Sequence, residues 1–112
     1  MTRYLISFDD GAMTFPQEDL PEVAKASHEV VERAKQAGVW IFGGGIESHE
    51  VSIVATDGSV SDGPTPGSRP HIGGLSIIDV PSHEDALRWA AEIALACRCA
   101  QEVREIMYDP DS

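Results

Sequence analysis

His28 is the side chain of this sequence whose chemistry best suits proton transfer. An imidazole gains and loses a proton near neutral pH, so it can serve a substrate as a general base or as a hydrogen-bonding group. His28 falls at the edge of the apolar stripe of a predicted helix, where a side chain can line a cleft. The alternative is a histidine that only occupies a helix edge.

Two aspartates are candidate acid partners for His28. Asp62 belongs to an Asp-Gly-Pro turn, in which a carboxylate more often binds the local backbone. Asp79 interrupts an apolar strand, and strand alternation places it on the face opposite Ile78. The sequence alone does not choose between the two aspartates.

Candidate groups for holding an anionic substrate lie in the last predicted strand and in the segment SDGPTPGSRPHIGG at residues 61–74. The planar guanidinium of Arg104 suits a carboxylate or a phenolate, and an ordinary ion pair with one of the many acids is the alternative. Arg69 and His71 are placed to close over an anion from the loop, unless they are solvated loop residues. We expect this segment to be an irregular connection, long enough to cover a pocket.

The triple glycine at 43–45 does not belong to a nucleotide-binding motif. A phosphate loop needs a lysine and a serine or threonine that open a helix, whereas another strand is predicted here. These glycines instead indicate a bulge or a close backbone approach. The histidines, together with Cys97 and Cys99, show no paired zinc spacing, so we expect no metal and no cofactor.

Two amphipathic helices must position these groups. Asp19 is predicted to cap the first helix with Glu22 in the capping-box position, and Gly38 ends it near residue 37. Ser82 caps the second helix, with Asp85 three residues later. Alternating or branched apolar residues predict strands at 3–8, 39–47, 51–55, 75–80 and 101–107, with a tight turn after the third of them.

The order of these elements is strand, helix, strand, an extra hairpin, strand, helix, strand. It predicts an α+β fold, a ferredoxin-like βαββαβ sandwich with an inserted β-hairpin, in which both helices cover one face of a mostly antiparallel sheet. The other face has no cover within the chain. Because large apolar patches are seldom left in water, we expect a homodimer.

The length and composition of the chain limit the number of domains and the kinds of partner that we expect. A length of 112 residues and 42% hydrophobic residues are typical of one folded domain over residues 1–112. Eight basic residues against nineteen acidic ones give a net charge of −11, which repels nucleic acid and anionic membranes alike. No apolar run is long enough to span a membrane and no signal peptide is evident, so we expect a cytoplasmic protein.

Several segments, taken in order, resemble the YCII-related family in its DGPF-domain branch: HEVVERAKQAG at 28–38, TDGSVSDGP at 56–64, GGLSIIDVPSHEDALRWA at 73–90 and EVREI at 102–106. The resemblance covers most of the chain and implies a dimeric α+β barrel. It also implies a histidine on the first helix, often with an aspartate, as a catalytic pair, and one branch includes a dehydrochlorinating enzyme of aromatic degradation.

Two functions follow as hypotheses. The first is a cofactor-independent enzyme in which His28 transfers a proton on a small polar or aromatic substrate, an aspartate orients His28, and Arg104 holds an anionic group. The second is a non-catalytic dimeric module that binds a small ligand or a regulatory protein. The resemblance makes a transcription-linked partner conceivable for this module.

Overall fold

The computed structural model describes residues 1–47, 51–63 and 70–112. The chain forms, in order, β1 (Thr2–Asp9), a short 3-10 turn η1 (Gln17–Asp19), α1 (Leu20–Gln36), β2 (Trp40–Gly45), β3 (Val51–Val54), β4 (Val60–Gly63), β5 (Ile72–Val80), α2 (His83–Cys97) and β6 (Glu102–Glu105). This order confirms the predicted succession of strands and helices, including the inserted hairpin.

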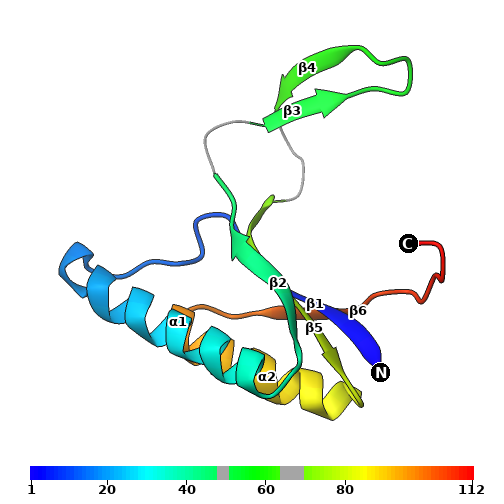
Figure 1. Cartoon of the computed structure of the whole chain (residues 1–112). Helices are drawn as coiled ribbons and strands as arrows, with labels where there is room; N and C mark the ends of the chain where they lie inside the picture. The colour runs from blue at the N-terminus through cyan, green and yellow to red at the C-terminus, as the bar shows by residue number, and fades with distance from the viewer. Residues whose placement is uncertain (48–50, 64–69) are drawn as a thin grey trace.

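The main sheet contains four antiparallel strands in the order β2-β5-β1-β6. Figure 1 shows α1 and α2 side by side on one face of this sheet. The strand order and the single helical layer are those of a ferredoxin-like fold, so the predicted fold class is confirmed. Within the described residues, the opposite face of the sheet carries neither helix; we call it the bare face.

The helices begin and end largely where capping chemistry predicts. The Ser82 hydroxyl accepts a hydrogen bond from the backbone N–H of Asp85 at 3.2 Å, which confirms the cap of α2. Gly38 follows α1 with a φ of +76°, a left-handed conformation that glycine adopts without strain. Arg98 follows the last residue of α2 as its C-cap. It is a non-glycine residue that also adopts the left-handed conformation, with a φ of 57°.

The predicted cap of α1 differs from the structure. Asp19 occupies the N-cap position, but its side chain makes no capping hydrogen bond. Its carboxylate instead accepts a hydrogen bond from Arg98 at 2.8 Å, and Glu22 lies 3.8 Å from the same guanidinium. Arg98, at the end of α2, therefore contacts the two acidic side chains that the sequence predicted would cap α1 locally.

The core lies between the helices and the covered face of the sheet. Ile6 of β1 and Ile78 of β5 are fully buried there, and Ala86 and Ala90 bring α2 close to the strands because their side chains are small. Strand β5 starts at Ile72, earlier than predicted, since its glycine-rich beginning is held by pairing with β1 and β2 on both sides.

Strands β3 and β4 pair only with each other, and Figure 1 shows their hairpin standing clear of the main sheet. The tight turn between them confirms the prediction from the sequence. Asp57 accepts hydrogen bonds from the backbone N–H and the hydroxyl of Ser59, at 2.9 and 2.7 Å. Both hydrogen bonds lower the pKa of Asp57, and the bond from the backbone N–H of Ser59 has the larger effect.

No helix in the described parts of the chain combines the length and apolar character that crossing a membrane requires.

Candidate functional site

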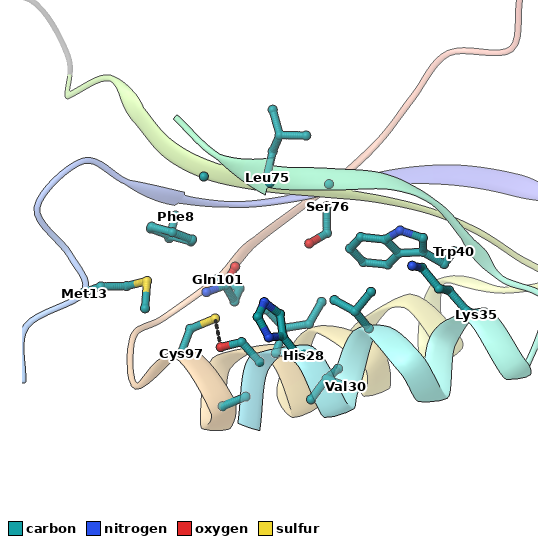
Figure 2. A pocket seen from close by; sticks show the side chains of 17 residues that line it. Phe8, Met13, His28, Val30, Lys35, Trp40, Leu75, Ser76, Cys97 and Gln101 are labelled. Carbon is teal, nitrogen blue, oxygen red and sulfur yellow. Dashed lines mark hydrogen bonds between the residues drawn. The ribbon is translucent and has the colours of Figure 1, made fainter. Parts of the chain in front are cut away.

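A pocket of about 410 Å³ lies between the helical layer and the covered face of the sheet. Such a volume suits a small organic molecule. Figure 2 shows side chains that enter it from α1 and α2 on one side and from the strands on the other. The residues that line it are Phe8, Met13, Ser27, His28, Val30, Val31, Lys35, Trp40, Gly43, Gly44, Gly45, Leu75, Ser76, Ile93, Ala96, Cys97 and Gln101.

Glycines in the sheet make room for the aromatic walls of this pocket. A Cβ atom added to Gly43 would lie 2.6 Å from the indole ring of Trp40 and 2.8 Å from the carbonyl oxygen of Leu75. A Cβ atom added to Gly74 would overlap the ring of Phe8 in the same way. The predicted close backbone approach at residues 43–45 is therefore present at Gly43. The register shift in β2 lies earlier, between Trp40 and Phe42, and the three glycines themselves pair in unbroken register with β5.

His28 projects from α1 toward the sheet and lines the pocket (Figure 2). His28 is exposed to solvent, because it lies outside the buried stripe of α1 that includes Val30. Among the described residues no side chain forms a hydrogen bond or ion pair with His28. Its imidazole is thus available to a ligand in the pocket.

Sulfur and amide groups form the end of the pocket near the C-terminus of α2. The Ser27 hydroxyl and the Cys97 thiol lie 3.5 Å apart, which links α1 to α2 beneath His28 (Figure 2). The Gln101 amide donates to the carbonyl oxygen of Cys99 at 3.4 Å. Burial, and secondarily the neighbouring Cys97, raise the pKa of Cys99. Cys97 lines the pocket, and Cys99 does not.

The two predicted acid partners are not brought to His28. Asp62 is in β4, opposite Ser52 of the separate hairpin. Asp79 is in β5 on the bare face, where one oxygen lies 4.0 Å from Arg3 and the other is buried without a hydrogen-bond partner. Neither aspartate lines the pocket, so a pair of His28 with either of them is absent from this arrangement of the chain.

The three predicted anion-binding residues lie in different places. Arg104 is exposed in β6 and pairs across the sheet with Leu5, which puts it on the bare face. His71 lines a separate shallow hollow with Asp10, and its carbonyl oxygen accepts a hydrogen bond from the Asp10 N–H at 2.7 Å. Arg69 lies outside the described residues. The described part of the chain contains no group of three or more potential metal ligands.

Sequence reasoning missed most of the side chains that surround His28, above all Lys35 and Trp40. One available signal was the spacing of His28 and Lys35: seven residues are close to two turns of a helix, so both side chains share one face. The contributions of Phe8 and Gln101 had no such signal, because they reach the pocket only through the pairing of distant strands and the turn after α2.

Comparisons with known proteins agree with this fold. The model of the YCII-related domain matches residues 2–108. No curated protein matches the chain. A solved structure that it resembles is 5-chloro-2-hydroxyhydroquinone dehydrochlorinase from Burkholderia phenoliruptrix in complex with 2,5-dihydroxybenzoquinone. The two are 14% identical, with a TM-score of 0.55 over 99% of this chain and 98% of that one.

Proposed function

Because the chain belongs to the YCII-related family, we propose that it is a cofactor-independent enzyme whose pocket holds a small polar or aromatic molecule beside His28. The observation that carries this proposal is the pocket itself. It has a suitable volume, aromatic walls formed by Phe8 and Trp40, and one unpartnered imidazole directed into it (Figure 2). The dehydrochlorinase of similar fold acts on a hydroxylated ring, which is a molecule of this class.

In this proposal the neutral imidazole of His28 accepts a proton from a ring hydroxyl or ring carbon of the substrate. The leaving group is bound to a saturated ring carbon in a keto tautomer of the substrate. The electron pair left behind forms a new double bond at that carbon and expels the group as an anion, so the products are a ring with one more double bond, the anion and a protonated His28 that returns its proton to water. The aromatic side chains of Phe8 and Trp40 offer the ring an apolar surface beside His28. Among the described residues no carboxylate lines the pocket to orient the imidazole, so helix α1 and the bound ring must do so.

The lack of a carboxylate near His28 also favours a second candidate, a binding module without catalysis. A general base is commonly oriented by a third group, and among the described residues His28 has none. In the binding module His28 only donates or accepts a hydrogen bond to the ligand. The two candidates share the pocket and differ in whether the ligand is converted.

We further propose that a second copy of this chain covers the bare face. Strand register places Leu5, Phe42 and Ile77 there, and Phe42 is 62% exposed. The same face carries Arg104, which has no described ion-pair partner, and the buried Asp79 oxygen without a hydrogen bond. In a twofold pair each face meets itself, so a cation of one copy can reach an acid of the other.

The test of catalysis measures chloride release from 5-chloro-2-hydroxyhydroquinone by the wild type, His28→Gln and His83→Gln. We expect release by the wild type and by His83→Gln, whose histidine is outside the pocket, and at least about 100-fold slower release by His28→Gln. Thermal shift with 2,5-dihydroxybenzoquinone is measured in parallel. A His28-dependent shift without chloride release would assign the binding module, and the absence of both would overturn the proposal.

A further inference from the structure

Among the described residues that line the pocket, one carries a positive charge and none carries a negative charge. The chain has nineteen acidic residues against eight basic ones. Of the seventeen residues that line the pocket, Lys35 alone carries a formal charge, and none is an aspartate or a glutamate. The electrostatic character of the pocket is therefore opposite to that of the molecule as a whole.

Lys35 is also unpaired, in contrast to most other cations. On the same helix, Arg33 donates to Glu92 at 3.0 Å and Lys25 lies 4.0 Å from Glu29. The remaining described cations with an ion pair are Arg3, Arg88 and Arg98. Among the described residues, no carboxylate lies within ion-pair distance of Lys35, so its ammonium has no internal partner.

The position of Lys35 relates it to the rest of the site. His28 and Lys35 are two helical turns apart on α1, about 10 Å along the helix axis, and both face the sheet. Figure 2 shows the amine of Lys35 beside Trp40 at one end of the pocket, with His28 farther along the same helix. A ring lying against Trp40 would thus place one substituent near the ammonium and another near the imidazole.

From these observations we propose that the ligand of the pocket is a small aromatic acid, a single ring with a carboxylate or an ionised phenol that Lys35 binds. This inference rests on the proposed function, since it specifies the substrate class of the same pocket. It replaces Arg104, which lies on the bare face, as the cation that holds the anionic group. Lys35 binds and orients the ring, and His28 acts on the opposite substituent.

The test compares benzoate with its neutral analogue benzamide. Binding is followed by the fluorescence of Trp40 in a Trp89→Phe background, because Trp40 lines the pocket and Trp89 does not. We expect the wild type to bind benzoate about fivefold or more tightly than benzamide, since hydrogen bonds to charged groups exceed neutral ones. Raising the salt concentration should reduce this ratio.

Three lysine variants distinguish a local contact between Lys35 and the ligand from the electrostatic field of the whole protein. Lys35→Met should bring the ratio of the two dissociation constants close to one and leave benzamide binding within about twofold. Lys25→Met, which makes the same change in net charge on the same helix, should keep the wild-type ratio. Lys35→Arg should restore most of the preference for benzoate.

The outcomes also distinguish this inference from the proposed function. Equal binding of benzoate and benzamide by the wild type, with loss of both in His28→Gln, would keep the small-molecule pocket and overturn the role of Lys35. An equal effect of Lys25→Met and Lys35→Met would overturn it as well. If neither ring bound the wild type at millimolar concentration, the inference would fail, whereas the proposed pocket function would fail only if 2,5-dihydroxybenzoquinone also gave no thermal shift and no chloride were released.

Discussion

The two faces of the four-stranded sheet differ in what covers them. On the covered face, the helices pack over the core, and the remaining space is a pocket in which His28 and Lys35 lack partners within the described chain. On the bare face, Arg3 contacts Asp79, Arg104 has no described ion-pair partner, and Phe42 is 62% exposed. In our proposal the covered face admits a small molecule, and the bare face, with its mixed apolar and charged character, meets another copy of the chain.

The largest expected effect concerns the bare face. Phe42→Asp would place a charge within the proposed contact between two copies, and we expect a loss of about 2–4 kcal/mol in association, which converts dimers into single chains at micromolar concentration. Light scattering coupled to gel filtration measures the change. Leu95→Asp is the matched control, because Leu95 is 83% exposed on α2. A wild-type protein that is already a single chain would contradict the proposal.

A smaller effect, on the stability of the fold, is expected at Gly43 on the covered face, where there is no room for a side chain. Gly43→Ala forces a methyl group against Trp40 and the Leu75 carbonyl oxygen, so we expect it to destabilise the fold by about 1–3 kcal/mol and to weaken ligand binding. Gly44→Ala is the control, since a Cβ atom there meets nothing within 4 Å. Urea unfolding gives both values. Equal stabilities of the two variants would mean that Trp40 moves aside freely.

The smallest effect is a dependence of stability on alkaline pH. Burial raises the pKa of Tyr4 above its usual value of 10.0, and the negative charge of Glu105, 3.5 Å away, adds to the shift. The unfolded chain therefore loses this proton first, so stability should fall as the pH rises above about 10 and should not change through Tyr4 below it.

Urea midpoints at pH 9 and pH 11 test this, in a Cys99→Ser background because the pKa of Cys99 is raised too. Tyr4→Phe should show a smaller loss between the two pH values, and Tyr108→Phe, at a residue that is 90% exposed, should behave as the parent. The same loss in all three proteins would show that Tyr4 is not the group responsible.

The fold was predictable because its signals are local. Helical periodicity, the Ser82 cap and the left-handed Gly38 depend on residues within a few positions of one another, and strand alternation correctly put Asp79 opposite Ile78. Asp19 was the exception. Its partner Arg98 is 79 positions away in the sequence, and no local sequence pattern predicts a contact at that separation.

The site was predictable only at His28, whose placement follows from the face of one helix. The rest of the pocket depends on which strands become neighbours. Gly43 was expected within a strand and Gly74 in the irregular segment 61–74, and the pairing of β2 with β5 places each of them against an aromatic ring. An aspartate partner was expected because chemistry suggested one, whereas alternation within β5 directs Asp79 to the other side. The face of the strand on which Asp79 lies therefore determines that it is not close to His28.

The net charge of −11 has a consequence for how an acidic ligand would arrive. Such a ligand is repelled by the overall negative charge and attracted only over short distances by the Lys35 ammonium, so its encounter with the pocket should be slow in dilute buffer and faster once counterions shield the repulsion. The same ions weaken the final contact with the ammonium. Added salt should therefore accelerate both the arrival and the departure of an acidic ligand.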